Sequence, residues 1–463
     1  MSPEVRHEND FAGMVSIPAT ALWGAQTQRA RDVFAISSLR LPPAYFHVLG
    51  ELKKAAALAN RDLGLLEPDI AEAIIEAAGE VASGALDDQF DIDLFQTGSG
   101  TNSNMNANEV IANRANQLLG HTLGAKHPVH PNDHVNMGQS SNDVTPTVIN
   151  ATALWAIEHT LLPAVHLLRA SLRATAERTD RVVKTGRTHL QDAVPIRMGQ
   201  EFEGHAGQLD RSLRRLAAAR EGLEEVALGG TAVGTGLNGH PQFAATTLSY
   251  LSQALRVNVY ETSNHFQAQN NFDEIVFASG ALRSLATSLL KIAEDVRWMS
   301  SGPRAGLNEI TIDSLGMGSS IMPGKSNPIV AEAVLQVVAK VSGNDATIAT
   351  AAGRGNFEII VTSPVVAHAL LESIDILAGA CVVFATRCID TIIPNSDGPA
   401  RVDQTLMLAT ALSPVIGYDR AAEIMVLAST TGQSIAEVAS TELDLPAEVL
   451  RRTLDPIAMT HAP

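Results

Sequence analysis

The sequence predicts a mostly α-helical protein with long helices at its centre. Its 463 residues are 45% hydrophobic but only 4% aromatic, so Ala, Leu, Val and Ile make up most of the apolar mass. This composition favours closely packed helices over aromatic-rich β-sandwiches. In one long run the apolar positions recur in steps of three and four: Leu282, Leu285, Leu289, Ile292 and Val296. Such spacing is typical of the contact seam in a left-handed helix bundle.

The N-terminal third alternates helical runs with polar loops. Residues 1–45 carry several prolines in mixed patterning, which predicts short strands and turns. Helical periodicity starts at Phe46 and continues through the eighties. The remaining elements of this region are expected to be a polar loop over 98–106, a helix over 107–119 and a second loop over 120–146.

Helices then dominate up to Pro394. There is no Gly or Pro from residue 164 to 185, Gly280 is the only helix breaker from 242 to 301, and helical spacing continues over 328–352. These runs exceed the average helix length of about 11–12 residues. Apolar seams on more than one side indicate a bundle whose partner helices come partly from other subunits. After Pro394 a more polar composition predicts a small domain of shorter helices.

Charge and cysteine content disfavour several classes of function. A net charge of −17 argues against nucleic-acid binding and against an anionic membrane surface, but it leaves room for a local cationic site that binds a small anion. Cys381 and Cys388 lie in one helical run, which suits two buried thiols and a reducing cytoplasm. The polar N-terminus is not expected to be a signal peptide. The apolar stretch 365–384 contains charged residues and is expected to be a core helix, not a membrane span.

One short loop carries the densest set of chemical groups. Residues 318–327, called here the signature loop, read Gly-Ser-Ser-Ile-Met-Pro-Gly-Lys-Ser-Asn, and the Gly and Pro residues exclude a helix or a central strand. Lys325 supplies a cation and Asn327 a carboxamide beside two adjacent hydroxyl groups. Pro328 then suits the start of a helix, where backbone N–H groups favour anions. The loop is therefore suited to bind a carboxylate and to act on a neighbouring atom.

Three further patterns resemble known binding motifs, but their residues do not match those motifs. Gly-Lys-Ser in the signature loop is not a phosphate loop, because Ser319 stands where that motif needs Gly. The glycine-rich run 229–236 does not match a dinucleotide fingerprint and predicts a tight turn. His127, His130 and His134 are separated by prolines and have no Cys nearby, so we expect anion binding or turn capping there and no metal site.

Three other polar loops accompany the signature loop. They read Thr97-Gly-Ser-Gly-Thr-Asn-Ser-Asn-Met-Asn, His130-Pro-Asn-Asp-His-Val-Asn-Met-Gly-Gln-Ser-Ser-Asn-Asp and Gly186-Arg-Thr-His-Leu-Gln-Asp. Any one of them suits helix capping or a turn. Four such loops in one helical protein are more than capping requires, and they indicate a shared chemical site.

In this order the motifs resemble those of the fumarase/aspartase superfamily. The signature Gly-Ser-Ser-Ile-Met-Pro-Gly-Lys-x-Asn-Pro is present, and so are the three loops above and the run Gly229-Gly-Thr-Ala-Val-Gly-Thr-Gly-Leu-Asn. The resemblance extends from about residue 7 to residue 458, nearly the whole chain. It implies a mostly α, three-domain fold: an N-terminal lyase domain over 1–139, a central bundle of five long helices over 140–394, and a small helical domain over 395–463.

The same resemblance implies an assembly and two candidate activities. The assembly is a homotetramer with a twenty-helix core, whose active sites are shared by three subunits and take a small dicarboxylate without cofactor or metal. The first activity is the reversible hydration of fumarate to (S)-malate, by anti addition and elimination through an aci-carboxylate intermediate. The second is aspartate ammonia-lyase activity. Positions such as Ser99 and Ser141 resemble hydratases, whereas the surroundings of His134 and Gly302 resemble the ammonia-lyases. Substrate contacts decide specificity, so hydration is expected.

The resemblance also assigns roles to individual residues. Ser319 would take the carbon-bound proton, His189 would handle the proton of the departing hydroxyl, and Glu332 would orient His189. The substrate-binding residues would be Ser99, Gly100, Thr101, Ser140, Ser141, Asn142, Thr188, Ser320, Lys325 and Asn327. A second anion site would consist of His130, Pro131, Asn132 and Asp133.

Three positions depart from the superfamily pattern. Ser326 stands where Val is usual, Ile359-Ile360 replaces Leu-Asn, and His134 replaces an Asp. None of these changes removes a residue with a proposed catalytic role. A non-catalytic descendant of the fold is disfavoured for the same reason.

Overall fold

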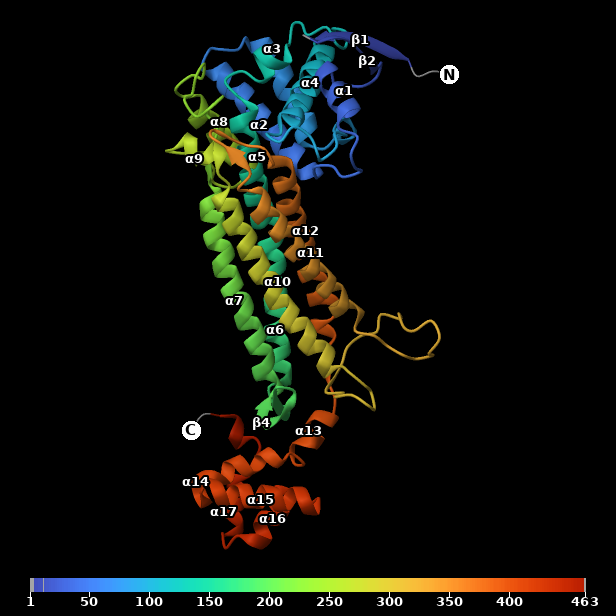
Figure 1. Ribbon diagram of the computed structural model, residues 1–463, viewed down its shortest axis with the longest axis vertical. Coiled ribbons are helices and arrows are strands. Elements are labelled where there is room, and N and C mark those ends of the chain that lie inside the picture. The colour runs from blue at the N-terminus through green and yellow to red at the C-terminus, as the bar shows by residue number, and fades with distance from the viewer. Residues whose placement is uncertain (1–3, 11, 462–463) are drawn as a thin grey trace. The chain divides into compact units, whose positions relative to one another are not determined.

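The computed structural model describes residues 4–10 and 12–461, and it is mostly helical, as the sequence predicts (Figure 1). Seventeen α-helices are present in these described residues. The strands form five small sheets, each of two strands. The predicted mostly α fold class is therefore confirmed.

The α-helices of the described chain have the following bounds: α1 (Ala25–Val33), α2 (Pro43–Asp62), α3 (Pro68–Ala82), α4 (Thr101–Leu118), α5 (Ser141–Ala156), α6 (Leu162–Thr179), α7 (Met198–Leu223), α8 (Phe243–Leu255), α9 (His265–Asn270), α10 (Asp273–Met299), α11 (Ile329–Ala351), α12 (Ser363–Arg387), α13 (Asp397–Val402), α14 (Ser413–Ile416), α15 (Tyr418–Thr431), α16 (Ile435–Glu442) and α17 (Ala447–Thr453). The strands are β1 (Val5–Asp10), β2 (Gly13–Pro18), β3 (Val183–Thr188), β4 (Gln191–Arg197), β5 (Glu225–Val226), β6 (Tyr260–Glu261), β7 (Ile310–Thr311), β8 (Gly355–Asn356), β9 (Ile359–Ile360) and β10 (Ile393–Pro394). Short π-helical turns are η2 (Pro131–Val135) and η3 (Ile157–Leu161), and short 3₁₀ turns are η1 (Asp87–Gln89), η4 (Ile389–Thr391), η5 (Leu406–Leu412) and η6 (Ala458–Thr460).

The chain divides into two compact units, each built from three separate segments. Unit 1 comprises Met1–Pro163, Arg214–Ser284 and Ala339–Leu377, and unit 2 comprises Ala164–Leu213, Leu285–Val338 and Ala378–Pro463. The predicted domain bounds at 139 and 394 stay a prediction, because these units are assembled from non-contiguous segments.

Unit 1 contains a cluster of packed helices around α2. This helix contacts α3, α4, α5 and α8, and its apolar side chains Leu49 and Leu52 are fully buried. Gly50 lets α3 approach closely, since a Cβ atom there would lie 2.6 Å from the backbone nitrogen of Ala82. Close packing of small residues explains how a chain with few aromatic side chains builds a dense core.

The apolar seam predicted after residue 280 lies in α10 and is buried. Leu282, Leu285, Leu289, Ile292 and Val296 are all at most 1% exposed. Burial of every member of the seam agrees with the helical period that the sequence predicts. The long helices α7, α10, α11 and α12 appear in Figure 1 as extended coiled ribbons.

The C-terminal helices α14 to α17 pack on η5 around their own small core within unit 2. Leu412, Ile424, Ile435 and Ala439 are at most 1% exposed in this cluster. A capping box starts α16, where the Ser434 side chain accepts a hydrogen bond from the Glu437 backbone. The shorter helices predicted after Pro394 are confirmed.

Three predicted element boundaries are wrong. Helix α4 begins at Thr101 and not at 107, because the side chains of Asn104, Asn106 and Asn108 are buried in contacts with other segments and do not form a loop. Helix α5 begins at Ser141 and continues through Pro146, so the predicted loop over 120–146 ends six residues early. The region after 242 is broken between α8 and α10 by a left-handed residue, Arg256, and by a short strand.

The two cysteines are free and buried, as predicted. Burial raises the pKa of each thiol to about 12, so neither is a reactive thiolate at neutral pH. Cys381 lies in α12, and Cys388 follows directly after its last residue.

Among the residues that the structure describes, three helical segments are long and apolar enough to cross a membrane by length and composition alone. They are Ser141–Thr179, Asp273–Met299 and Ser363–Thr391, and 50–56% of their most apolar windows is buried. The stretch 365–384 lies in the third segment. Its buried face includes Val366, Leu370 and Ile374, in keeping with the expected core helix.

Candidate functional site

The signature loop has a defined backbone fold in unit 2. Gly318 and Ser326 form an isolated bridge, and the Ser319 N–H donates to the Lys325 carbonyl oxygen at 3.2 Å. Gly318 is required at this bridge, because a Cβ atom would lie 2.5 Å from the Lys325 carbonyl oxygen. The two ends of the loop are thereby held together while its middle stays exposed.

The hydroxyl oxygen of Ser319 accepts hydrogen bonds from two backbone N–H groups. Its Oγ accepts hydrogen bonds from the N–H groups of Ile321 at 3.2 Å and Met322 at 3.0 Å. Donors placed in this way stabilise negative charge on the oxygen, so they favour the alkoxide that a serine base needs. A serine base needs such donors, and the signature loop supplies them.

Lys325 and Asn327 lie together where the loop enters α11. The Lys325 ammonium donates to Asn327 Oδ1, and both side chains are accessible to solvent. Helix α11 starts one residue after Pro328, whose carbonyl oxygen accepts from the Glu332 N–H at 3.1 Å. Glu332 is thus in the first turn of the helix, as expected. A cation and a carboxamide at a helix N-terminus form a favourable environment for a carboxylate.

His189 lies at the tip of a β-hairpin in unit 2. Strands β3 and β4 pair up to Thr188 and Gln191, so His189 and Leu190 form a two-residue turn. Both residues have positive φ, at 56° and 60°. Turns of this kind prefer Asn and Gly, and a side chain in the left-handed region costs about 1–2 kcal/mol. The hairpin holds the His189 imidazole in an exposed position at its tip. Backbone strain of this kind is typical of functional positions.

A buried ion network lies beneath this hairpin. The Lys184 ammonium lies 2.7 Å from Glu201 and 2.7 Å from Glu309, and Arg187 lies 2.7 Å from the other Glu309 oxygen. Lys184 and Glu309 are almost fully buried. Because Lys184 and Arg187 both belong to β3, the network fixes the strand that carries Thr188 and leads into His189.

The hydroxyl groups predicted to bind the substrate carboxylates lie at the N-termini of two helices in unit 1, α4 and α5. Gly100 adopts a left-handed conformation directly before α4, and a Cβ atom there would lie 2.8 Å from the Thr145 side chain of α5. The hydroxyls of Ser99 and Thr101 share a hydrogen bond of 2.8 Å. The starts of α4 and α5 therefore lie side by side, and their dipoles favour an anion between them.

The Ser-Ser-Asn loop, residues 140–142, opens α5 through a capping box. Ser140 accepts from the Asn142 N–H at 3.2 Å, and the Asp143 carboxylate accepts from the Ser140 N–H at 2.9 Å. The Asn142 amide donates to the Ala232 carbonyl oxygen at 2.8 Å. The loop is thus tied to the glycine-rich run 229–236, which forms the tight turn that the sequence predicts.

Asp143 and Lys53 are buried charges next to this loop that sequence analysis missed. Asp143 Oδ2 accepts from the N–H groups of Gly229 at 3.2 Å and Thr231 at 2.9 Å. Burial raises the pKa of Asp143 to about 6 and lowers that of Lys53 to about 7. The available signal was the position of Lys53 on α2, because it follows Leu49 and precedes Ala56 on a buried helical face.

The predicted second anion site is a π-helical turn in unit 1. His130 Nδ1 accepts from the N–H groups of Asn132 and Asp133, each at 3.2 Å, and the His130 N–H donates to His134 Nδ1 at 2.9 Å. Burial lowers the pKa of His134, so its neutral ring acts as the acceptor. Within residues 4–10 and 12–461, no three His, Cys, Asp or Glu side chains are arranged to hold a metal ion.

The predicted site residues divide between the two units. Unit 1 holds the hydroxyl groups at the starts of α4 and α5 together with the His130 turn, and unit 2 holds the His189 hairpin and the signature loop. The expected pair between His189 and Glu332 is not formed in this chain, because neither side chain has a hydrogen bond or ion pair to another described residue. That pair stays a prediction.

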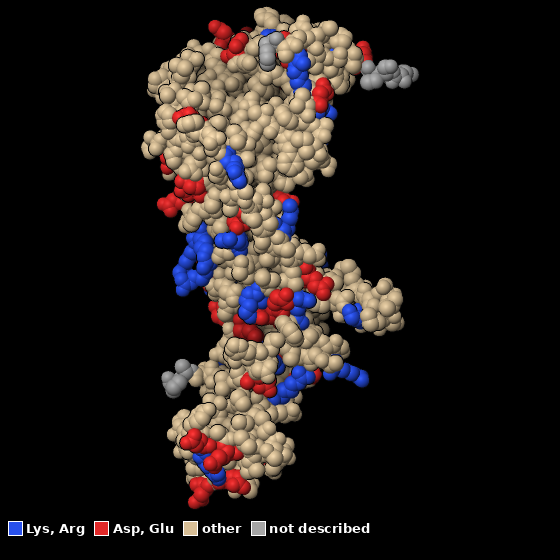
Figure 2. All heavy atoms as spheres, viewed as in Figure 1, with Lys and Arg blue, Asp and Glu red and all other residues tan. Residues whose placement is uncertain are grey.

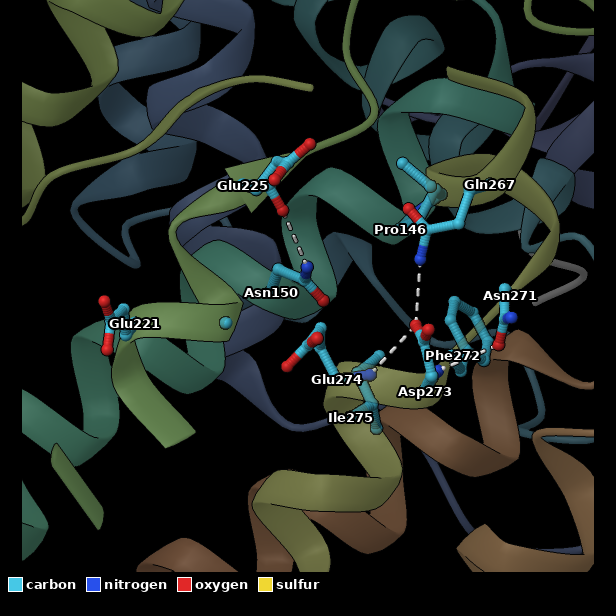
Figure 3. A pocket seen from close by; sticks show the side chains of 12 residues that line it. Pro146, Asn150, Glu221, Glu225, Gln267, Asn271, Phe272, Asp273, Glu274 and Ile275 are labelled. Atoms are coloured by element: carbon cyan, nitrogen blue, oxygen red, sulfur yellow. Dashed lines mark hydrogen bonds between the residues drawn. The ribbon is translucent and has the colours of Figure 1, made fainter. Parts of the chain in front are cut away.

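A small cavity elsewhere in unit 1 has the wrong charge for a dicarboxylate. It measures about 100 Å³ and is lined by four carboxylate side chains: Glu221, Glu225, Asp273 and Glu274. Figure 3 shows these groups together with Asn150 and Gln267. The side-chain amide of Gln267 donates a hydrogen bond to the Asp273 carboxylate at 2.9 Å. A dianion would be repelled there. The cavity contains none of the predicted site residues.

Comparisons with known proteins agree with the motifs. A family model described as lyase matches residues 13–343, and one described as fumarase C C-terminus matches residues 408–461. The chain is 50% identical to the class II fumarate hydratase of Halobacterium salinarum over 462 residues, which cover 100% of this chain and 98% of that protein. It is 48% identical to the class II fumarate hydratase of Thermus thermophilus over 442 residues, 94% of each chain.

Solved structures give the same result. The class II fumarase from Schistosoma mansoni has a TM-score of 0.96 at 34% identity, covering 99% of both chains. The fumarate lyase:delta crystallin from Brucella melitensis, bound to cobalt, has a TM-score of 0.95 at 42% identity, covering 99% of this chain and 100% of that one. The lyase match over most of the sequence and the full-length relatives together establish the family. The chain belongs to the lyase family that includes the class II fumarate hydratases.

Proposed function

We propose that this protein is a class II fumarate hydratase, which adds water reversibly to fumarate to give (S)-malate. The observation that carries the proposal is the full-length identity of 47–50% to proteins of that name. Aspartate ammonia-lyase is the alternative activity, because the surroundings of His134 and Gly302 resemble those of the ammonia-lyases. The relatives described above favour the hydratase.

The central chemical problem is a weakly acidic C–H bond. In the malate direction a proton leaves C3 beside a carboxylate, and the electron pair passes into that carboxylate to give an aci-carboxylate. The C–O bond at C2 then breaks, and the hydroxyl leaves as water. The ammonium of Lys325 and the amide of Asn327 are suited to hold the additional charge of the intermediate. Charge stabilisation and proton transfer suffice, so no cofactor or metal is required.

Ser319 is the proposed base for the C3 proton. A serine hydroxyl is a poor base unless its alkoxide is stabilised. The N–H groups of Ile321 and Met322 at 3.2 and 3.0 Å support this role, since both point to Ser319 Oγ. Ser320, next in the loop, would bind a substrate carboxylate.

His189 is the proposed proton donor for the departing hydroxyl, directly or through a water. Its position in a strained hairpin turn supports a role that needs a fixed imidazole. Thr188 lies beside it and would contact the substrate. Glu332 would orient and charge His189, as carboxylates do for imidazoles.

The two substrate carboxylates are proposed to bind at hydroxyl groups and helix N-termini. Ser99, Gly100 and Thr101 open α4, and Ser140, Ser141 and Asn142 open α5. Their N–H and hydroxyl groups suit a dianion. The turn formed by His130, Pro131, Asn132 and Asp133 is proposed as a second anion site.

Complete sites are proposed to form in a homotetramer, with three subunits contributing to each one. Large apolar side chains on the surface of the long helices support this assembly: Phe277 is 52% exposed and Trp298 50% exposed on α10, and Val383 is 44% exposed on α12. A twenty-helix core would cover such faces. The enzyme is proposed to act in the cytoplasm, without a nucleic-acid or membrane partner. Figure 2 shows basic and acidic side chains on the same visible face.

A paired assay tests the proposed activity. The purified protein is given (S)-malate and, separately, L-aspartate. Fumarate formation is followed by its ultraviolet absorbance, and ammonia release is measured in parallel. Turnover of malate without release of ammonia from aspartate is the expected result. Ammonia release from aspartate, with no malate turnover, would assign the protein to the alternative activity.

A further inference from the structure

A buried lysine lies directly behind the Ser-Ser-Asn loop. Lys53 belongs to α2 and is fully buried, yet its ammonium donates only to neutral side chains: Asn136 Oδ1 at 3.1 Å and Gln139 Oε1 at 2.9 Å. Burying an ammonium without a carboxylate contact is expensive. Because burial of the Lys53 ammonium costs free energy and no carboxylate contact offsets that cost, we expect a functional reason for Lys53.

The hydrogen bonds of Lys53 lead to the predicted substrate-binding residues. The Asn136 oxygen that accepts from Lys53 also accepts from the amides of Asn104 at 3.2 Å and Asn108 at 3.1 Å. The same Asn104 amide donates to Ser141 Oγ at 3.1 Å. Ser141 is therefore two side chains away from the ammonium.

The second branch reaches the backbone before the loop. Gln139 immediately precedes Ser140, and its carbonyl oxygen accepts from the Asn136 amide at 3.2 Å. The Gln139 side chain amide is anchored on the Val135 and Met137 carbonyl oxygens at 3.1 and 3.2 Å. Lys53 thus holds the chain on both sides of the turn that leads into the loop.

The charge of Lys53 also has a counterpart. Asp143 is fully buried at the start of α5, and its negative charge favours the protonated form of Lys53. By itself, a buried carboxylate two residues from Ser141 would disfavour a substrate anion. The buried ammonium of Lys53 offsets that charge and leaves the helix N-termini free to attract a carboxylate.

We propose that Lys53 is a positioning residue of the substrate-binding loop: through Asn136 and Gln139 it orients Ser141, and its positive charge selects a dianionic substrate. This inference rests on the proposed function, because it assumes that residues 140–142 bind a carboxylate. Lys53 does not touch the substrate. Lys53 is expected to affect the affinity for the substrate, whereas Ser319 is expected to affect kcat.

Replacement of Lys53 by methionine tests the inference. The variant Lys53→Met keeps an unbranched side chain that reaches as far as the lysine Cε atom and removes the ammonium group. In assays at about pH 6, below the pKa of about 7 that burial gives Lys53, the ammonium is present. Under these conditions we expect KM for malate and fumarate to rise about 10-fold, the equivalent of about 1.4 kcal/mol of binding, while kcat changes less than about threefold. The competitive inhibition constant of succinate should rise in parallel, whereas that of butyrate, with one carboxylate, should change less. The matched control is Lys54→Met, at the neighbouring, partly exposed position of α2, where the Lys54 ammonium lies 3.7 Å from Glu51.

A second variant covers the case in which Lys53→Met does not fold. Gln139→Glu keeps the size of the side chain and places a carboxylate against the ammonium. A purely structural lysine would gain an ion pair, and KM would not move. The proposed role predicts a higher KM, because the new carboxylate cancels the field at the loop. Circular dichroism and gel filtration check that each variant keeps its fold and assembly.

The outcomes separate this inference from the proposed function. If the unmodified protein does not convert malate, the proposed function fails. If it does, and both Lys53→Met and Gln139→Glu keep KM within twofold of the parent, only the role of Lys53 is refuted. A fall in kcat without a change in KM in the folded variants would refute it as well.

Discussion

The ammonium group of Lys184 and the carboxylate of Glu309 lie 2.7 Å apart and are 2% and 1% exposed. Arg187 holds the other Glu309 oxygen at 2.7 Å, from a position 122 residues away in the sequence. The pair therefore joins the His189 hairpin to the segment that follows α10. It anchors a proposed catalytic residue without contacting it.

Removing one member of this buried pair should be strongly destabilising. For Lys184→Met we expect a loss of about 3–5 kcal/mol, because Glu309 would keep its burial but lose a counter-charge. The loss is measured as the shift of the urea unfolding midpoint at fixed protein concentration. Arg197→Met serves as the control, since its pair with Asp180 is more exposed and should contribute about 1 kcal/mol or less. Equal losses in both variants would contradict the assigned role.

Ser319→Ala should lower turnover sharply and leave the fold intact. Removal of a proton-transferring group typically costs about 10²–10⁴-fold in rate. Ser319 is only partly buried and is not part of the apolar core, so little packing is lost. The measurement is kcat for malate. The neighbouring substitution Ser326→Val, which introduces the residue usual in the superfamily, should keep kcat within about threefold, because Ser326 takes part only through its backbone. Full activity in Ser319→Ala would remove the proposed base.

The turn at His189 and Leu190 should be open to stabilisation. Leu190 is 61% exposed and has a φ of 60°, so its side chain contributes little packing and its backbone is strained. Leu190→Asn should raise the free energy of unfolding by up to about 1 kcal/mol, since Asn tolerates this conformation. Thermal unfolding measures the gain. Leu190→Ala, which keeps a Cβ without the tolerance of Asn, should show no comparable increase.

The stability of the protein should depend on pH through Lys53. Burial lowers its pKa from 10.5 to about 7 in the folded state. Between these values the unfolded chain binds a proton that the folded chain has released, so the free energy of unfolding rises with pH. Relative to Lys53→Met, the parent protein should therefore gain stability from about pH 7 to pH 10.

Unfolding midpoints of both proteins over that range give the measurement. The slope of the difference is at most about 1.4 kcal/mol per pH unit. A difference that stays flat would mean that Lys53 keeps its proton in the folded state. Lys54→Met again provides the comparison for loss of a lysine from α2.

Local patterns of the sequence determined the helices and the motifs. The period of the seam from Leu282 to Val296 depends only on the geometry of one helix, and burial follows it. The Gly and Pro residues of the signature loop exclude regular structure for equally local reasons. The hydroxyl-rich loops could also be found in this way, although their boundaries could not, because the buried Asn side chains of α4 resemble loop residues in the sequence.

The tertiary structure alone decided which groups meet. Lys53 and Asn136 are 83 positions apart, and no local pattern pairs them. The positive φ values of His189 and Leu190 follow from the pairing of β3 with β4, not from the preferences of the two residues. Burial of Lys184 against Glu309 depends likewise on segments brought together by folding. Burial and long-range pairing set the energy of a charge, and a linear sequence contains the charge but not its surroundings.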